Sequence, residues 1–357
     1  MAKLKVGFIG TGKVPERPSA MGYAMAYKHA NAYARLDSCQ LVACADIVRE
    51  NAEAFAKRYG IERVYTDYRQ MLEEEGLDVV SICTWPKLHA EMAIACARAG
   101  VKLCHCEKPM DLTYGGSRLM LQVADQYGMH LNFNHQRRYG KPFRKTKELL
   151  DSGEIGDLVR MEAAIGDLYD GGTHWVDMLN YFNNETPAEW VIGQIDARRE
   201  RLAFGAPVEW QGVCHVRYRN GVFGLFVTGQ AHREALGVAF RLFGTKGIIE
   251  IAWSPDPGPM LRYWKEGSPE WIPVDCEGEN LHGPGYIDRA IADAVACFLE
   301  GRECELCARH AMNATEIIFA CYESSRRRAR IDCPLDINDN PLEAMIESGE
   351  VPWAPAE

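Results

Sequence analysis

The sequence predicts an α/β Rossmann domain with a doubly wound parallel sheet, followed by an α+β domain with a large, mostly antiparallel open sheet. Three observations support this. Strand and helix patterns alternate at βαβ spacing up to residue 134. A glycine turn, Gly10-Thr11-Gly12, follows the first strand. Later residues form short alternating runs separated by turns, as antiparallel strands do. We therefore expect domains at residues 1–134 and 135–357.

The composition is that of an ordinary globular protein and excludes several classes of partner. Of 357 residues, 47% are hydrophobic and 25% are charged. A formal net charge of -10 and a pI near 5.6 argue against nucleic acid or an anionic membrane as a partner. We find no signal peptide in residues 1–9 and no apolar run of membrane-spanning length. A soluble cytoplasmic protein is expected.

Thirteen cysteines are scattered along the chain, which is typical of reduced thiols in a cytoplasmic protein. Cys304 and Cys307 have zinc-site spacing, and Cys104 and Cys106 form a closer pair. Neither pair has a second pair or a histidine at the distance a zinc site requires. No metal is therefore expected.

The first strand, Lys5–Ile9, runs into the glycine turn. Gly10 permits a tight turn, and Gly12 lets a pyrophosphate approach the backbone. The third small residue of this nucleotide-binding pattern is delayed, because an insertion, Lys13–Met25, precedes the helix. Ala26 is the candidate for that third position.

Asp46 follows the second strand, Leu41–Ala45. A carboxylate there can accept hydrogen bonds from both ribose hydroxyls and would repel a 2′-phosphate, which favours NAD over NADP. The nearby Arg49 keeps NADP possible. Asp46 could also cap the following helix, and the two roles are compatible.

The rest of the first domain continues the alternation. Helices are expected at Asn51–Tyr59, Tyr68–Glu75, Leu88–Ala99 and Thr113–Tyr127, and strands at Val64–Tyr65, Asp78–Cys83, Leu103–Cys106 and His130–Asn134. After Cys83, Thr84 and Pro86 should lie at the carboxyl edge of the sheet, beside the nicotinamide ribose. For His89, a bond to the backbone or a helix cap is favoured over a chemical role.

The stretch Glu107-Lys108-Pro109 ends a predicted strand at the same edge. A partly desolvated lysine beside a carboxylate can act on a reacting hydroxyl. The alternative is a surface Glu-Lys pair without a chemical role. By itself the stretch does not separate these two interpretations.

In the second domain, strands are expected at Val159–Ala164, Trp190–Ala197, Trp210–Tyr218, Gly224–Gly229, Ala239–Phe243 and Ile248–Ala252. Helices are expected at Pro142–Leu150, Tyr286–Leu299 and Ala308–Arg328, and residues 334–357 as a loose tail. The turn Arg219-Asn220-Gly221 predicts a hairpin.

Asp170 and His174 are four residues apart and would share the first turn of a helix that starts at Gly171 or Gly172. A histidine there can take a proton from an alcohol, and an aspartate can orient the imidazole or bind a substrate hydroxyl. The spacing alone favours a plainer interpretation, with Asp170 as a helix cap and His174 in the core.

Taken together, the glycine turn with Asp46, Glu107-Lys108-Pro109 and Asp170-x-x-x-His174-x-x-Asp177 resemble the Gfo/Idh/MocA oxidoreductase family. The resemblance implies a Rossmann domain that binds NAD(P) and a second domain that carries the substrate site and often an oligomer interface. It also implies that Lys108, Asp170 and His174 are catalytic, with His174 as general acid/base, and that Lys108-Pro109 is often cis.

Further site residues follow from the motifs and the resemblance. The cofactor-binding set is Gly10, Gly12, Ala26, Asp46, Thr84, Pro86, His89, Glu107 and Lys108. The pocket is expected to contain His135, Tyr139 and Tyr169. Two departures stand out, namely the insertion and a short stretch between Gly156 and Asp170. The insertion could cover the ligand instead, through Arg17 or Tyr23.

The expected function is hydride transfer between NAD and a secondary alcohol of a sugar, glycoside or polyol by a homodimer or homotetramer. Two alternatives remain. One is a glycosidase that recycles NAD through oxidation and elimination. The other is a non-enzymatic nucleotide-binding regulator, which is disfavoured because a sensor does not need three proton-transfer groups.

Overall fold

The computed structural model describes residues 2–15 and 23–354. The chain divides into two compact units. Unit 1 is Met1–Leu112, Gly116–Gln136 and Ile287–Ala311, and unit 2 is Thr113–Gly115, Arg137–Tyr286 and Met312–Glu357. The main crossing between the units, at Gln136, lies close to the boundary expected at Asn134. The segment Ile287–Ala311 differs from the expected division, because it returns to unit 1.

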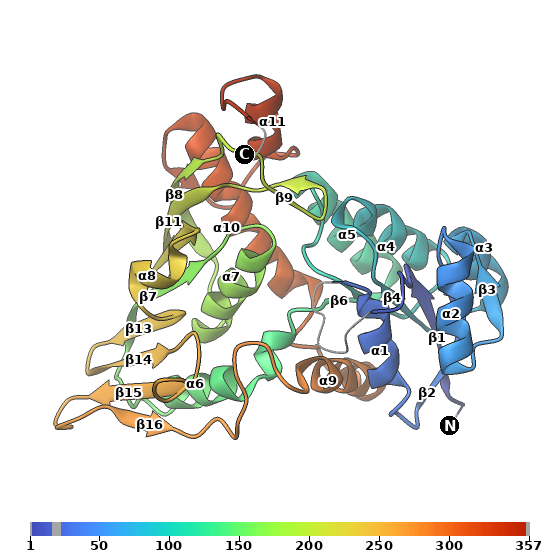
Figure 1. The fold of residues 1–357 in the computed structure, drawn as a ribbon, viewed down its shortest axis with the longest axis horizontal. Coiled ribbons are helices and arrows are strands. Elements are labelled where there is room, and N and C mark those ends of the chain that lie inside the picture. The colour runs from blue at the N-terminus through green and yellow to red at the C-terminus, as the bar shows by residue number, and fades with distance from the viewer. Residues whose placement is uncertain (1, 16–22, 355–357) are drawn as a thin grey trace. The chain divides into compact units, whose positions relative to one another are not determined.

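Among the described residues, unit 1 contains a six-stranded parallel sheet (Figure 1). Its strands are β1 (Leu4–Ile9), β2 (Cys39–Ala45), β3 (Arg63–Tyr65), β4 (Val79–Ile82), β5 (Leu103–Cys106) and β6 (His130–Phe133). Their order, β3-β2-β1-β4-β5-β6, is that of a doubly wound nucleotide-binding sheet. The fold class predicted for this part of the chain is therefore confirmed.

Helices cover the unit 1 sheet because the strands are apolar on both faces. They are α1 (Met25–Tyr33), α2 (Arg49–Tyr59), α3 (Tyr68–Glu75), α4 (His89–Arg98), α5 (Tyr114–Tyr127), α9 (Tyr286–Glu300) and the short 3-10 helix η1 (Pro86–Leu88). Val6 and Phe8 of β1 are fully buried in a core that includes Phe55 of α2 and Ile291 of α9. Since all six strands are parallel, β1, β4 and β5 deliver their last residues to one edge.

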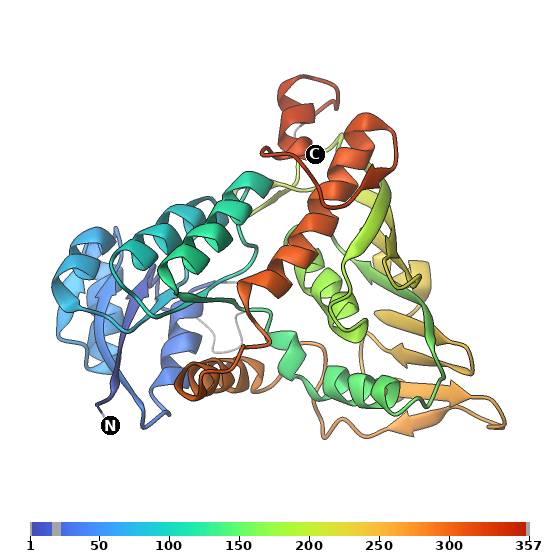
Figure 2. The ribbon, with the colours of Figure 1, turned by 180° about the vertical axis from the view of Figure 1, so that it is seen from behind.

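Among the described residues, unit 2 contains a nine-stranded sheet in the order β16-β15-β14-β13-β7-β12-β11-β8-β17. Figure 2 shows the ribbon of this unit from behind. The strands are β7 (Leu158–Ile165), β8 (Ala188–Asp196), β11 (Gln211–Tyr218), β12 (Phe223–Gly229), β13 (Phe240–Gly244), β14 (Gly247–Ile251), β15 (Leu261–Lys265), β16 (Ile272–Val274) and β17 (Ile331–Asp332). The neighbours pair antiparallel except β7 and β12, which pair parallel. The mostly antiparallel sheet predicted for this domain is confirmed.

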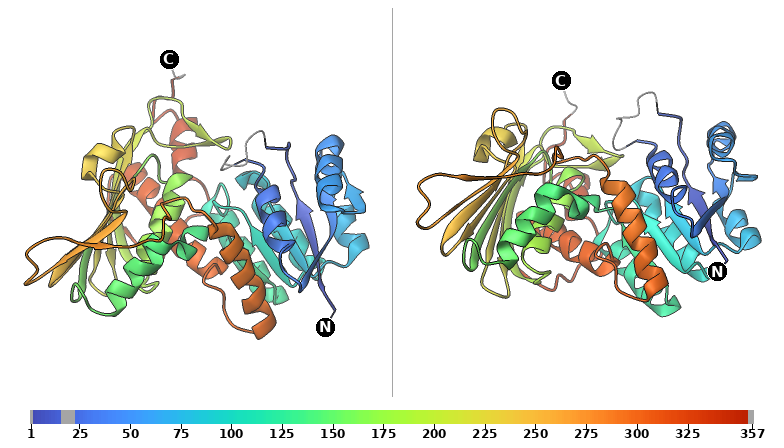
Figure 3. Two further views of the ribbon diagram at one scale, coloured as in Figure 1. Left: turned by 60° about the horizontal axis from the view of Figure 1, so that its bottom comes forward. Right: turned by 90° about the horizontal axis from the view of Figure 1, so that it is seen from below.

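One face of this sheet is covered by α6 (Lys141–Asp151), α7 (Gly171–Phe182) and α10 (Ala308–Arg327) (Figure 3). Phe240 of β13 makes ring contacts with Phe143 of α6 and Trp175 of α7. Gly193 of β8 lies so close to α10 that a Cβ there would be 2.2 Å from the Cys321 sulfur. The alternation along the strands therefore has a structural cause, since one face packs on these three helices.

Several elements depart from the sequence prediction. The pattern did not indicate β15, β16, the short helices α8 (His232–Leu236) and η2 (Gln136–Tyr139), or the two-stranded ribbon of β9 (Leu202–Ala203) and β10 (Ala206–Pro207). The predicted hairpin is confirmed, with Gly221 at φ 86° between β11 and β12. No helix in the described part of the chain is long and apolar enough to cross a membrane.

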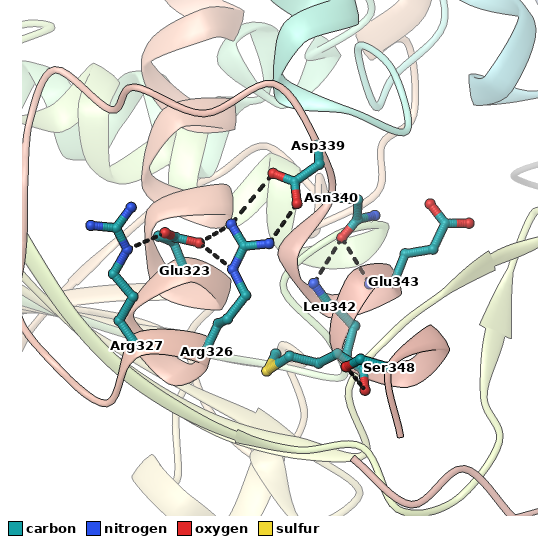
Figure 4. Close-up of polar contacts among 9 residues, drawn as sticks. Glu323, Arg326, Arg327, Asp339, Asn340, Leu342, Glu343 and Ser348 are labelled. Carbon is teal, nitrogen blue, oxygen red and sulfur yellow. Dashed lines mark hydrogen bonds and ion pairs between the residues drawn. The ribbon is translucent and has the colours of Figure 1, made fainter. Parts of the chain in front are cut away.

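The segment expected to be a loose tail is instead ordered, at least up to residue 354. It contains α11 (Pro341–Glu347), whose first amide groups, those of Leu342 and Glu343, donate to the Asn340 side chain (Figure 4). Arg326 at the end of α10 bonds both Glu323 and Asp339. The proline- and acid-rich composition was misleading because Asn340 caps a helix here and Asp339 pairs with Arg326.

Candidate active site

The glycine turn of unit 1 forms one wall of a cavity of about 450 Å³. The backbone φ angles of Gly10 and Gly12 are 81° and 66°, which residues with a side chain rarely adopt. A Cβ on Gly10 would lie 2.5 Å from the Thr84 methyl carbon. The turn therefore leaves exposed backbone where a pyrophosphate can approach, and these residues fit a bound dinucleotide.

Asp46 lies beside this turn and lines the same cavity. Its carboxylate accepts from the Gly12 amide at 2.8 Å, the Thr11 hydroxyl at 3.1 Å and the Val48 amide at 2.9 Å. The interpretation of Asp46 as the cap of α2 is wrong, because Val48 holds the N-cap position and no side chain caps that helix. Two carboxylate oxygens offer about four acceptor sites, so ribose hydroxyls can still bind.

The other predicted cofactor residues divide into two groups. Thr84 lines the cavity and so does Tyr23, while Arg17 lies outside the described residues. Ala26 is fully buried in the first turn of α1, and Pro86 is buried at the start of η1. His89 does not line the cavity. Its ring nitrogens lie 2.9 Å from the Pro109 carbonyl oxygen and 3.1 Å from that of Thr84, so it ties the ends of β4 and β5 together.

Glu107, predicted to bind cofactor, has its carboxylate in a buried cluster below the edge of the sheet. Its Oε1 is 3.0 Å from Nε2 of His29 and accepts from the Asn134 amide at 2.8 Å. The other imidazole nitrogen of His29 is 2.7 Å from the Ser81 hydroxyl. The cluster joins α1 to the carboxyl ends of β4, β5 and β6, and Lys108 follows directly.

The charges of this cluster are set by its members. Burial alone would lower the pKa of His29, but Cys83 and Glu107 outweigh it and raise the pKa to about 10. Burial acts to raise the pKa of Glu107, but His29, Lys108 and Asn134 lower it to about 2. The pair is thus imidazolium and carboxylate at neutral pH. Lys108 itself is half-buried, and its bond to Pro109 is cis, as the resemblance implied.

In unit 2, α7 starts at Gly171, which confirms the predicted start and places Asp170 and His174 on its first turn. The Asp170 side chain does not cap the helix. Asp167 does this, because its Oδ1 accepts from the amides of Asp170 at 2.6 Å and Gly171 at 3.3 Å. The helix end therefore does not require the Asp170 carboxylate, in contrast to the plainer interpretation of the spacing.

A second carboxyl group, that of Glu209, lies near Asp167. Glu209 is fully buried and accepts from the Leu168 amide and the Tyr322 hydroxyl, both at 2.7 Å. Arg201 lies 3.2 Å from Asp167 and also donates to the Gly166 carbonyl. Burial and the nearby Asp167 raise the pKa of Glu209 from 4.5 to about 7. Glu209, which holds the segment before α7 through the Leu168 amide, therefore titrates near neutral pH.

This titration predicts a pH-dependent stability. The folded protein holds the Glu209 proton more tightly than the unfolded chain does. The contribution of this proton to the free energy of unfolding is therefore complete below pH 4.5 and is lost as pH rises towards 7. The loss should be on the order of 3 kcal/mol relative to Glu209→Gln. Urea unfolding of both proteins from pH 4.5 to 8 measures the difference. If the free energies of unfolding of the two proteins change in parallel with pH, the raised pKa of Glu209 is contradicted.

The last motif residue, Asp177, has a structural role. Arg138 donates to it from Nε at 2.9 Å and from Nη2 at 2.7 Å, and also pairs with Glu185 at 2.7 Å. Both members of the Arg138–Asp177 pair are almost completely buried. The candidate pocket residues are buried as well, namely His135, Tyr139 and Tyr169. Their role in substrate binding stays a prediction.

Sequence reasoning missed His29, Asp167, Glu209 and Arg137. His29 lies three residues after Ala26, on the buried side of α1. The available signal was therefore an ionisable side chain on the apolar face of a helix. In unit 1, Asp293, Cys297 and Cys304 also lie within 4.8 Å of one another. The Arg302 guanidinium donates to Asp293 and to the Cys297 sulfur, so this cation already balances the negative charge of the group.

Comparison with known proteins agrees with this geometry. Residues 4–135 match the oxidoreductase family with an NAD-binding Rossmann fold, and residues 164–250 match the Gfo/Idh/MocA C-terminal domain. The chain is 25% identical to myo-inositol 2-dehydrogenase of Thermotoga maritima in an alignment of 265 positions that covers 69% of this chain and 74% of the relative.

Two further likenesses cover most of the chain. Levoglucosan dehydrogenase of Pseudarthrobacter phenanthrenivorans is 29% identical in an alignment of 300 positions that covers 70% of this chain and 73% of the relative. The crystal structure of the WlbA dehydrogenase from Bordetella pertussis, in complex with NADH and UDP-GlcNAcA, has a TM-score of 0.73 at 20% identity and covers 94% of this chain and all of the other. With its NAD-binding Rossmann domain and its matching second domain, the chain belongs to the Gfo/Idh/MocA oxidoreductase family.

Proposed function

We propose that this protein is an NAD-dependent dehydrogenase that acts on a secondary alcohol of a sugar or polyol. One observation carries the proposal. Helix α1, which follows the nucleotide turn, is joined to the residue before Lys108 in a buried charged cluster, with His29 Nε2 3.0 Å from Glu107 Oε1. A protein that only bound nucleotide would not need the end of β5 tied to the helix that follows the phosphate turn.

NAD, when bound, takes up or delivers a hydride at its nicotinamide ring. The protein residues have to bind the alcohol and move its proton. His174 accepts the hydroxyl proton, Asp170 orients the imidazole or a substrate hydroxyl, and Lys108 donates a hydrogen bond to the same oxygen. The convergence of these three side chains on one oxygen stays a prediction.

The substrate class is supported by the relatives. The names of two of them state dehydrogenation of myo-inositol and of levoglucosan, and a third relative, from Escherichia coli, is named D-glucoside 3-dehydrogenase. All three names point to ring alcohols of carbohydrates or polyols. We infer that the alcohol oxidised by this chain belongs to the same chemical class.

A panel of alcohols tests the proposal directly. Polyols, aldoses and glycosides are each offered with NAD and with NADP, and the absorbance of reduced cofactor is followed. The expected result is reduction of NAD by at least one polyol or sugar, and more slowly of NADP because Asp46 opposes a 2′-phosphate. Cleavage of a glycoside without net NADH would instead favour the oxidation–elimination reaction. No turnover despite tight NAD binding would favour a regulator.

The open face of the unit 2 sheet supports a homo-oligomer. Ile192 of β8 and Val213 of β11 are apolar, and 46% and 44% of their surface is exposed. We expect a homodimer or homotetramer that pairs through this face, so the double variant Ile192→Lys/Val213→Lys should sediment as a smaller species. An unchanged sedimentation coefficient would place the interface elsewhere.

All thirteen cysteines are free thiols, which supports a reducing, cytoplasmic location.

A further inference from the structure

Arg137 is a buried cation whose hydrogen-bonding capacity is only partly used. The residue is 8% exposed, and its Nη2 donates to Nδ1 of His282 at 3.0 Å. Its Nε and Nη1 have no hydrogen-bond partner among the described residues. A buried donor without a partner destabilises the fold, and more so when it is charged, so such a group calls for a ligand or another functional reason.

The aromatic residues around Arg137 add further donors and no acceptors. Its guanidinium carbon lies 4.6 Å from the ring centre of Trp175, which stacks on Trp253 at 6.1 Å. The indole N–H groups of both tryptophans also lack partners within residues 2–15 and 23–354. Arg233 lies over the second ring at 5.4 Å. The cluster thus contains several N–H donors without partners, which suits a ligand rich in acceptor oxygens.

The position of this cluster connects it with the proposed chemistry in unit 2. Trp175 directly follows His174 in α7, so the stacking partner of Arg137 is the neighbour of the proposed base. Asp170 is close enough that its charge raises the pKa of Arg137, although burial lowers that pKa overall to about 10. Burial and the two arginines lower the pKa of His282 to about 4, so its ring is neutral and accepts from Arg137. A ligand bound by Arg137 would lie beside the first turn of α7.

The charge balance distinguishes between possible anions. Arg137 is the buried cation, while Asp170 and Asp177 act on it from the same unit. Since Arg138 already pairs with Asp177, Asp170 is the acid that opposes an anion here. A singly charged carboxylate therefore complements the cluster better than a doubly charged phosphate, which Asp170 repels more strongly. The flat guanidinium, fixed by its indole neighbour, also matches a planar carboxylate.

We propose that Arg137, together with the Trp175 and Trp253 indole groups, binds a carboxylate of the substrate, so that the preferred substrates are sugar or polyol acids. The inference rests on the proposed dehydrogenase function and narrows its substrate class. Arg137 then acts as a specificity residue that holds the acid group while a hydroxyl of the same molecule reaches His174.

Binding is measured first and without turnover. Isothermal titration calorimetry is performed on the full-length protein saturated with NADH, with D-glucuronate, D-galacturonate and D-gluconate as acids. D-glucose, D-galactose and D-sorbitol are the neutral partners, and D-glucose 6-phosphate tests a phosphate. We expect each bound acid to bind at least tenfold more tightly than its neutral partner. Equal affinities of acids and neutral partners, or tighter binding of the phosphate, would overturn the proposal.

Variants assign the effect to one side chain. Arg137→Met should weaken acid binding by about tenfold to a hundredfold and leave neutral ligands within about threefold. Arg137→Lys keeps the charge and should recover part of the affinity. The control is Arg199→Met, because Arg199 is an exposed arginine stacked on an indole, 5.2 Å from the Trp210 ring centre. Equal losses for acids and neutral ligands in Arg137→Met, or losses in the control, would contradict the assignment.

Turnover separates this inference from the proposed function. If acids bind through Arg137 but neither acids nor neutral alcohols reduce NAD, the carboxylate site stands and the dehydrogenase proposal fails. If neutral alcohols are oxidised as efficiently as the acids, the dehydrogenase stands and the carboxylate site fails. Should Arg137→Met not fold, the comparison of acids with neutral partners in the wild type and Arg137→Lys still decides the matter.

Discussion

Replacing His174 by alanine should lower kcat by about a hundredfold to ten-thousandfold, because the alcohol loses its proton acceptor. The dissociation constant for NADH should stay within about twofold, since the nucleotide turn lies in unit 1 and His174 in unit 2. Steady-state kinetics on the best substrate of the alcohol panel and NADH fluorescence titration measure the two quantities. The pH–rate profile adds a readout that a structural role would not change, because the limb that reports the general base should disappear.

The matched control is His130→Ala, which removes an exposed histidine at the start of β6. It should leave kcat unchanged. Near-normal turnover of His174→Ala would refute the assigned role, and an equal loss in the control would point to general damage.

Lys108→Ala should produce a kcat loss of similar size, about a hundredfold or more, with NADH affinity kept. Lys108 follows β5. A second lysine, Lys102, precedes the same strand, and its exposed side chain pairs with Asp78. Lys102→Ala is therefore the control, and its kcat should be unchanged. Wild-type turnover of Lys108→Ala would remove this residue from the mechanism.

The other large effect is expected from the buried pair below Lys108. His29→Leu should lower the free energy of unfolding by about 3–5 kcal/mol, because it leaves the Glu107 carboxylate buried without its cation. The double variant His29→Leu/Glu107→Gln should recover part of this loss, since no uncompensated charge remains. Urea unfolding monitored by circular dichroism measures both variants.

An exposed ion pair of unit 1 provides the control. Arg35 and Asp288 lie 2.7 Å apart with 68% and 39% of their side chains exposed. Arg35→Ala should cost less than about 1 kcal/mol. If His29→Leu costs no more than this control, the pair does not hold the edge of the sheet together.

The contributions of His29 and Glu107 to the free energy of unfolding change with pH in opposite directions. His29 has a raised pKa, so its contribution is complete below pH 6.5 and is lost as pH rises towards about 10. Glu107 has a lowered pKa, so its contribution is complete above pH 4.5 and is lost as pH falls towards about 2. The stability difference between wild type and the double variant should therefore be largest between pH 4.5 and 6.5.

The sequence by itself was sufficient for the fold class of both units. Alternating strand and helix patterns predicted the parallel sheet, and α10 begins at the predicted residue and ends one residue early. Local signals are reliable here because burial on two faces or on one face leaves different periodicities. The sequence also predicted Gly10, Gly12 and Asp46 as cofactor residues, since a phosphate turn requires particular residue types at fixed positions, and all three line the cavity of unit 1.

Only the tertiary structure decided which side chains support that site. His29 and Glu107 are 78 positions apart, and Asp167 and Glu209 lie on separate segments of unit 2. No local pattern links such pairs, because each forms only when distant segments pack and exclude water from a charge. The same holds for Arg137, whose unpaired donors become visible only once the neighbours on every side are known. Periodicity reports where a residue is buried, while the partner it meets there depends on the packing of the whole unit.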